Sequence, residues 1–175
     1  MAITFRTMRN AVLRLLGARE RPRPAGSPAG PPPAGGAAGL HAAGYPGDFT
    51  GRAVVRYAPK PDGRPDPGEV VWTWVPYEED YTQGKDRPVL IVGRSGAFLL
   101  ALMLTSRDRV PAGSAAGDYV DVGTGAWDRQ RRPSEARLDR VLTIRPEAIR
   151  REGAVLGRAR FAAVADALRN RHGWS

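Results

Sequence analysis

Two apolar runs separated by a polar loop dominate the hydrophobic pattern of this 175-residue chain. The first run, residues 69–75, is almost entirely β-branched or aromatic and is bounded by prolines, which predicts a β-strand. The second, residues 88–92, is a short apolar run typical of a buried strand, and its proline stands at the first position, where a strand tolerates it. Because a polar loop held by two stiff strands is well placed to build a site, its side chains are candidates for function: Glu78, Glu79, Asp80, Gln83, Lys85, Asp86 and Arg87.

Further segments predict additional strands. Residues 97–104 are apolar throughout and fit either a buried helix or a buried strand, but their shortness and the flanking turn residues favour a strand. Residues 119–122 alternate between apolar and polar and predict a strand, and residues 135–144 alternate less regularly. Residues 53–57 predict either an edge strand or an extended arm that lies on the domain. The connection between residues 92 and 97 is expected to be a tight turn.

One helix is clearly predicted, over residues 158–170. Its apolar residues recur at helical spacing, and Gly173 follows as a stop signal. Proline at position 146 predicts one further helical turn over residues 146–149. Five or six short strands with one clear helix predict a mainly β fold, a small β-barrel with helical additions.

The first 47 residues differ in composition from the rest. Residues 1–20 place apolar side chains at helical spacing between arginines, which predicts a cationic amphipathic helix, with a frayed terminal extension as the alternative. This segment is too short and too charged to span a bilayer, which takes roughly 20 apolar residues. Residues 21–47 are rich in Pro, Gly and Ala and predict a disordered linker. The compact domain is therefore expected to occupy residues 48–175.

The net charge and the absence of cysteine limit the classes of site. The chain carries 27 Lys+Arg and 18 Asp+Glu, a formal charge of +9, which favours an anionic partner such as nucleic acid or an anionic membrane surface. A GC-rich coding sequence produces the same excess of arginine, so charge alone is a weak indication. Without cysteine there is no disulfide, thiolate zinc site or cysteine nucleophile, and the two histidines, His41 and His172, fall in segments expected to be peripheral.

An ordered set of short motifs between residue 67 and about residue 169 resembles the MazF/PemK family of bacterial toxin ribonucleases. The set comprises Gly68-Glu69-Val70-Val71-Trp72, Gln83-Gly84, Arg87-Pro88-Val89-Leu90, Leu104-Thr105-Ser106 and Arg140-Val141-Leu142-Thr143-Ile144, followed by the terminal helix. The resemblance implies an SH3-like barrel, a homodimer and cleavage of single-stranded RNA by attack of the ribose 2′-hydroxyl, without metal or cofactor. A homodimer would also bury Trp72 and Trp74, which share one face of the first strand. The resemblance further implies a cytoplasmic type II toxin–antitoxin system, in which an acidic, partly disordered antitoxin lies across the RNA-binding groove.

Carried over by motif, the resemblance assigns catalytic roles to Arg87 and Thr105. Arginine presents a planar fork of donors suited to phosphate oxygens, and a threonine hydroxyl can hydrogen-bond a phosphate oxygen. The identity of the general base is left open, because arginine has a pKa of about 12 and stays protonated at neutral pH. The carboxylate candidates are Glu78, Glu79 and Asp86. Contacts to RNA are expected from Gln83, Lys85, Ser106 and Arg107.

Two features depart from the family pattern. The acidic triplet Glu78-Glu79-Asp80 stands beside the expected site, where negative charge repels a phosphate backbone, and the long N-terminal extension has no counterpart in the compact toxins. The alternative function is therefore a MazF-like barrel with weak or no catalysis that acts as a binding or regulatory module, tethered to a membrane by peripheral contact of residues 1–19.

Overall fold

The computed structural model describes residues 44–175 apart from 61, 108–109, 111–112 and 115–116. For residues 151–153 it describes the backbone but not the side chains. The predicted amphipathic helix over residues 1–20 and nearly all of the predicted linker over residues 21–47 lie outside the described residues. Both therefore stay predictions.

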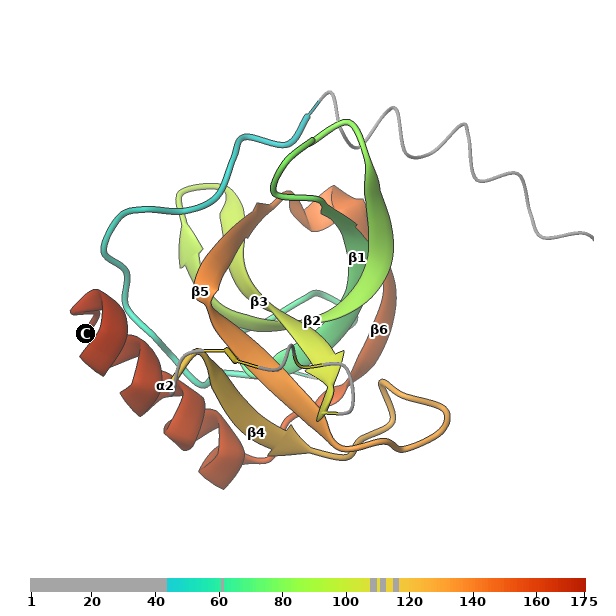
Figure 1. Cartoon of the computed structure of the whole chain (residues 1–175), viewed down its shortest axis with the longest axis vertical. Coiled ribbons are helices and arrows are strands. Elements are labelled where there is room, and N and C mark those ends of the chain that lie inside the picture. Colours follow the sequence, from blue (N-terminus) through green and yellow to red (C-terminus); the bar gives the residue numbers. More distant parts are fainter. Residues whose placement is uncertain (1–43, 61, 108–109, 111–112, 115–116) are drawn as a thin grey trace, which may run out of the picture. The chain divides into compact units, whose positions relative to one another are not determined.

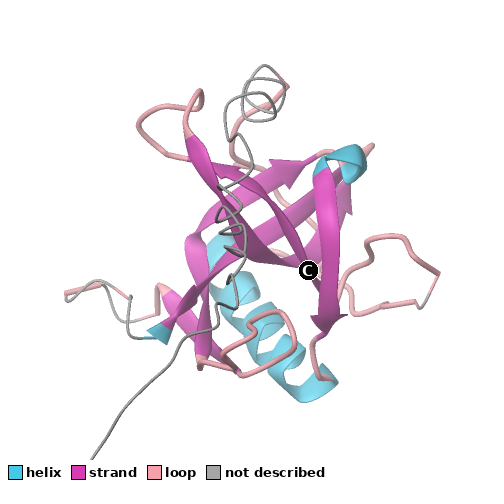
Figure 2. Ribbon diagram, turned by 90° about the vertical axis from the view of Figure 1, so that its right-hand side faces the viewer, coloured by secondary structure: helices cyan, strands magenta, loops and turns pink. Residues whose placement is uncertain are grey.

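Six antiparallel strands form one sheet that curls into a barrel (Figure 1). Along the sheet the strands follow the order β4-β5-β3-β2-β1-β6. Their bounds are β1 Glu69–Pro76, β2 Gly84–Ser95, β3 Phe98–Ser106, β4 Tyr119–Gly123, β5 Ser134–Ile144 and β6 Ile149–Val155. A short 3-10 helix, η2 (Pro146–Ala148), separates β5 from β6, and the α-helix α2 (Arg158–His172) packs along one side of the barrel (Figure 2). The predicted mainly β class, a barrel with a C-terminal helix, is confirmed.

The long strand β2 joins the two halves of the barrel. Its first part, Gly84–Leu90, pairs with β1, and its second part, Val89–Ser95, pairs with β3, with a register irregularity after Ile91. The two ladders overlap only at Val89 and Leu90. A strand that changes its partner halfway along bends the sheet, and this bend allows six short strands to surround a core.

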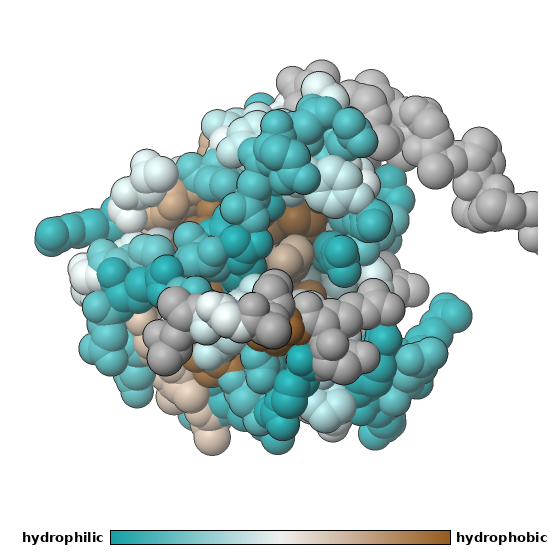
Figure 3. Space-filling model, in the orientation of Figure 1, coloured by the Kyte–Doolittle hydropathy of each residue, from teal (hydrophilic) through white to brown (hydrophobic). Residues whose placement is uncertain are grey.

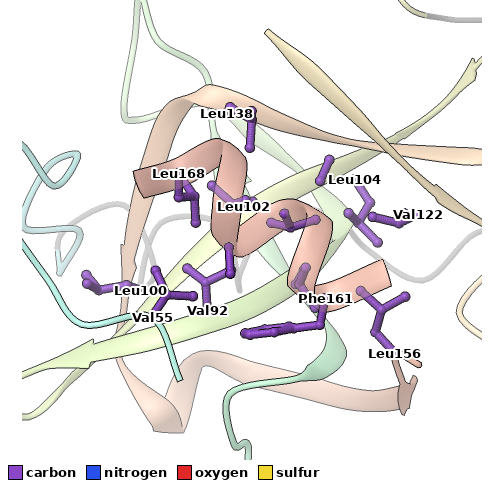
Figure 4. Packing of buried hydrophobic residues seen from close by; sticks show 14 of the residues in the cluster. Val55, Val92, Leu100, Leu102, Leu104, Val122, Leu138, Leu156, Phe161 and Leu168 are labelled. Carbon is purple, nitrogen blue, oxygen red and sulfur yellow. The ribbon is translucent and has the colours of Figure 1, made fainter. Parts of the chain in front are cut away.

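Both faces of the sheet are buried, which explains why its strands read as continuous apolar runs rather than alternating ones. On one face, Leu102 and Leu104 of β3 pack with Phe161 and Leu168 of α2 (Figure 4). On the other face a second cluster includes Val71, Val89, Ile91, Leu99 and Ile144. On the face shown in Figure 3, apolar side chains appear in patches between hydrophilic ones.

The predicted elements agree with the structure except at two places. The segment 97–104, which was open between helix and strand, is strand β3, and the helix predicted over residues 158–170 is α2, which ends at Gly173 in the left-handed conformation with φ 64°. The residues expected to form the turn after residue 92 instead continue β2 through Ser95. Strand β6 was not predicted, because its sequence IRREGAV is charged and lacks strand alternation; it pairs only with β1, at the edge of the sheet.

Residues 44–58, here called the N-terminal arm, lie extended on the barrel, so the arm alternative is the correct one for residues 53–57. The backbone N–H of Val55 donates to the carbonyl of Ser175 at 2.8 Å, and that of Ser175 donates to Ala53 at 3.2 Å. The indole of Trp174 donates to the carbonyl of Gly51 at 3.1 Å. These bonds tie the arm to the C-terminus. No helix in the described part of the chain is long and apolar enough to cross a membrane.

We expect the arm, but not the residues before it, to be needed for stability. Deleting residues 1–58 removes the buried side chain of Val55 and deprives Arg140, which is 8% exposed, of its partner Asp48; an unpaired buried charge costs about 3–5 kcal/mol. Deleting only residues 1–43 should leave the melting temperature nearly unchanged. Thermal unfolding followed by circular dichroism compares the two truncations, and equal melting temperatures would show that the arm is not part of the folded domain.

Candidate functional site

A pocket opens where β2 and β3 part. Their pairing stops at Val89↔Met103, and the next residue of β2, Pro88, has no N–H to donate to a neighbouring strand. The cavity beyond, here called the β2–β3 pocket, has a volume of about 200 Å³. Strands β1, β2, β3 and β5 and the loop before β5 contribute its lining: Trp72, Asp86, Arg87, Pro88, Leu104, Thr105, Ser106, Trp127, Asp128, Arg132 and Ser134.

The register of the sheet brings the two predicted catalytic residues to this pocket. Continuing the pair Val89↔Met103 by two residues along each strand leads to Arg87 and Thr105, and both line the cavity. Each is held from its other side, since Arg87 pairs with Thr73 of β1 and Thr105 pairs with Glu135 of β5. The two side chains therefore stand on fixed strands on either side of an opening.

Some polar side chains of the pocket have ion-pair partners and others do not. The carboxylate of Asp86 pairs with Arg150 of β6 at 2.8 Å, and that of Asp128 pairs with Arg132 at 2.7 Å. Within the described part of the chain, by contrast, the guanidinium of Arg87 forms no ion pair and the hydroxyls of Thr105 and Ser106 form no hydrogen bond. The pocket thus holds a cation without a counterion beside two free hydroxyls, an arrangement suited to an anionic ligand.

Two tryptophans build the wall of the pocket opposite these groups. The indole of Trp72 donates to the carbonyl of Trp127 at 3.1 Å, and the indole of Trp127 donates to the hydroxyl of Ser134 at 3.2 Å. The loop that carries Trp127 is shaped by Asp128, whose carboxylate accepts bonds from the backbone N–H groups of Gln130 and Arg132. The sequence indicated only a polar, basic loop here; the aspartate that caps its turn is the signal that could have marked an ordered loop.

Trp74, by contrast, is buried within the single chain, 9% exposed. Its burial therefore needs no second protomer, and the expectation that both tryptophans of β1 require one is wrong for this residue. Trp72 remains half-buried at the pocket.

The remaining predicted RNA contacts, apart from Ser106, lie beside the pocket rather than in its lining. Gln83 donates to the carboxylate of Asp80 at 2.8 Å, and the ammonium of Lys85 lies 5.8 Å from the ring centre of Tyr77. Arg107 pairs with Asp121 at 2.6 Å and with Glu135 at 3.1 Å. Each is one or a few residues away along the chain from a pocket residue, and their contact with RNA stays a prediction.

Of the three carboxylates considered as general base, Asp86 lines the pocket and Glu78 and Glu79 do not. Asp128 also lines it, but the hydrogen bond from the Arg132 side chain holds the pKa of this carboxyl below its ordinary value. Because an effective base has a pKa near the working pH, Asp128 is poorly suited to that role.

The acidic triplet is largely engaged by neighbouring groups. Glu78 accepts a hydrogen bond from Arg137 of β5. Asp80 accepts bonds from the side chains of Thr82 and Gln83, and the Thr82 hydroxyl is the main cause that lowers the pKa of Asp80. None of the three acids belongs to the pocket lining.

Comparison with known proteins supports the resemblance seen in the motifs. The family model described as PemK-like, MazF-like toxin of type II toxin-antitoxin system matches residues 66–171, more than half of the chain. The chain belongs to this family. The match includes all six strands and nearly all of α2, and it excludes the N-terminal arm.

Among solved structures, the chain is similar to the Mycobacterium tuberculosis toxin MazF-mt6, with 19% sequence identity, a TM-score of 0.45 and coverage of 61% of this chain and 98% of that one. It is also similar to the MazE-MazF (Form-II) structure from Deinococcus radiodurans, with 18% identity, a TM-score of 0.46 and coverage of 65% and 100%. No curated protein matches the sequence significantly.

We expect the tryptophan wall to support the fold and Arg87 not to. Trp127→Ala should destabilise the domain by about 3–5 kcal/mol, because Trp127 is 4% exposed, and Trp127→Phe by about 1 kcal/mol through loss of the bond to Ser134. Arg87→Ala, which breaks no ion pair with a described residue, should stay within about 0.5 kcal/mol of the unmodified protein. Urea unfolding measures all three. An unchanged midpoint for Trp127→Ala would contradict the structural role of the wall.

Proposed function

We propose that this member of the toxin family is an endoribonuclease that cuts single-stranded RNA at the β2–β3 pocket, without metal. The observation that carries the proposal is the Arg87 guanidinium, which has no counterion among the described residues and stands beside the free hydroxyls of Thr105 and Ser106. A scissile phosphate in the pocket would receive charge-assisted hydrogen bonds from Arg87 and neutral ones from the hydroxyls.

The proposed reaction is an internal transfer at phosphorus. The ribose 2′-oxygen attacks the adjacent phosphorus and the bond to the 5′-oxygen breaks, which leaves a 2′,3′-cyclic phosphate on one product and a 5′-hydroxyl on the other. Negative charge builds on the phosphoryl oxygens in the transition state, and preorganised donors such as Arg87 and Thr105 stabilise that charge. We assign the 2′ proton to Asp86, the one of the three candidate carboxylates that lines the pocket, and solvent water supplies the proton taken up by the 5′-oxygen.

The wall of the pocket offers a surface for a nucleobase. Trp72 is half-buried there, and a base next to the scissile phosphate can stack on an indole regardless of its identity. Lys85 and Arg107, which adjoin the pocket residues on β2 and β3, are the further contacts that we propose for neighbouring phosphates of the same RNA strand.

Removal of the Arg87 guanidinium should reduce the rate by roughly 10²–10³-fold, because the transition state loses charge-assisted donors. Arg87→Lys should not restore activity, since a point charge cannot reproduce the fork of donors, and Thr105→Ala should also slow cleavage. The assay incubates the full-length protein with a long unstructured RNA in the presence of EDTA and identifies the product ends.

The outcomes of this assay separate the alternatives. Cleavage that is equally fast after both alanine substitutions would place the site elsewhere, and an unchanged rate for Asp86→Asn would exclude Asp86 as the base. Purified protein that binds RNA but never cuts it would instead identify a binding or regulatory module.

The family also implies two kinds of protein partner, a second copy of the chain and an acidic antitoxin. An acidic segment that covers the pocket would compete with RNA for Arg87 and its neighbouring cations, so its affinity should fall as salt screens the charges.

We expect the purified protein to have twice the mass of one 18.9 kDa chain and to bind a small acidic protein of its native cell in a salt-dependent manner. Light scattering coupled to gel filtration measures the first, and co-purification at two salt concentrations measures the second. A concentration-independent monomer would disprove the homodimer, and recovery of no acidic protein at low salt would count against the antitoxin.

A further inference from the structure

The loop that leads from β1 into the pocket strand β2, residues 77–83, is fastened to β5 by two arginines. Arg140 donates from Nη1 to the carbonyl of Pro76, where the loop begins, at 2.8 Å, and from Nε to Asp48 at 2.9 Å. Arg137 donates to the carboxylate of Glu78, two residues further along the chain. Strand β5 is not a neighbour of β1 or β2 in the sheet, so these bonds cross the mouth of the barrel.

The tip of the loop, at Tyr81, contacts Asp48, Arg140 and Tyr45. The Tyr81 hydroxyl donates to Asp48 at 3.4 Å, and its ring lies 6.0 Å from the Arg140 guanidinium and meets the ring of Tyr45 edge-on at 5.1 Å. Tyr45 also donates to Asp48, and burial together with that carboxylate raises the pKa of the Tyr45 phenol. Both Tyr45 and Asp48 belong to the N-terminal arm, outside the part of the chain that matches the family.

Hydrogen bonds within the loop give it a defined conformation. The N–H of Tyr77 donates to the carbonyl of Gln83 at 2.9 Å, and Asp80 binds Thr82 and Gln83 within the loop. Gly84 then packs against Trp74 so closely that a Cβ would come within 2.6 Å of the indole. Arg87 follows three residues later, about 10 Å along the strand. The β1–β2 pairing fixes the two ends of the loop at Pro76 and Gly84, and the bonds to β5 hold the part between them.

This fastening also determines where the negative charge of the loop lies. Glu78, Glu79 and Asp80 would repel RNA that leaves the pocket along β2, but Arg137 pairs with Glu78 from β5 and offsets part of the negative charge of the loop. The side chain of Arg137 is 20% exposed, and its guanidinium also pairs with Asp139 at 2.6 Å, so its positive charge is shared between two carboxylates. An acidic loop next to a phosphate-binding pocket is thus made compatible with RNA by an arginine that need not touch RNA.

We propose that Arg137 and Arg140 are positioning residues for RNA binding, which hold the β1–β2 loop against β5 and keep its acidic residues from repelling the substrate. The proposal rests on the endoribonuclease function proposed above. It assigns no chemical step to either arginine. Loss of their bonds to the β1–β2 loop should therefore weaken RNA binding and leave the catalytic step at Arg87 intact.

The test uses the full-length protein and compares Arg137→Ala with Arg169→Ala. Arg169 is a matched control, an exposed arginine paired with Asp166 on α2, and its removal subtracts the same charge far from the loop in sequence. Arg137→Ala should raise KM for a single-stranded RNA roughly fivefold with little change in kcat, and the effect should shrink at high salt. Arg169→Ala should leave both constants unchanged.

A second substitution distinguishes positioning from general destabilisation. Glu78→Gln introduced into Arg137→Ala removes the negative charge that has lost its partner and should restore KM. If Arg137→Ala acted only by destabilising the fold, Glu78→Gln would not restore KM. For Arg140, the conservative Arg140→Lys retains a charge for Asp48 but cannot keep both bonds; it should speed hydrogen exchange of the Tyr77 amide, which bonds within the loop.

Different results would contradict the endoribonuclease function and the positioning role of Arg137 and Arg140. If the unmodified protein does not cut RNA, the endoribonuclease function is wrong, and the same variants are compared by their Kd for a fluorescent single-stranded RNA. Suppose instead that the unmodified protein cuts RNA. If Arg137→Ala then has the same KM as Arg169→Ala, or if Glu78→Gln does not restore a raised KM, the positioning role of the arginines is wrong while the endoribonuclease function stands. Absence of any RNA binding overturns both.

Discussion

The fold and the site both depend on the way β2 is shared between two neighbours. Its first residues are paired with β1 and its last with β3, and the ladders overlap only at Val89 and Leu90. A continuous double pairing would close the gap between β2 and β3 and leave no pocket. The change of partner occurs next to Pro88, which cannot donate to a ladder, so one residue type both permits the bend of the barrel and opens the cavity beside Arg87.

A buried cation holds the other end of the barrel. Arg140 is 8% exposed and has one nitrogen, Nη2, without a hydrogen-bond partner among the described residues. Burying a guanidinium that is incompletely satisfied is unfavourable unless its remaining bonds hold groups together that would otherwise separate. Here those bonds join the N-terminal arm through Asp48, the β1–β2 loop through Pro76 and β5 itself. The arm that takes part in these bonds lies outside residues 66–171, which match the family model.

The sequence predicts the elements of this fold better than their contacts. Continuous apolar runs indicated β1, β2 and β3 correctly, since a strand buried on both faces must be apolar throughout. The charged strand β6 gave no such signal, because an edge strand is held by backbone bonds to one neighbour and needs few apolar side chains. The assignment of Arg87 and Thr105 to one site followed from motif resemblance and not from periodicity, since register across strands is a property of the folded sheet. For the same reason the wall at Trp127 and the bonds of Arg137 and Arg140 to the β1–β2 loop were beyond prediction: each joins segments that lie far apart in the chain.

Position at the pocket together with pairing, rather than composition, distinguishes Arg87 from the other cations. A formal charge of +9 indicates an anionic partner but not where it binds. Within the described residues, ion pairs engage eight arginines: Arg94, Arg107, Arg132, Arg137, Arg140, Arg150, Arg169 and Arg171. Their charge is largely spent on neighbouring carboxylates. Arg87 does not belong to this group, and the carboxylate of Asp86, which precedes it, is paired with Arg150 of β6. Of the two arginines that line the pocket, Arg132 is paired with Asp128, whereas Arg87 forms no ion pair with a described residue. The guanidinium of Arg87 is therefore the one in this pocket that is available to a phosphate.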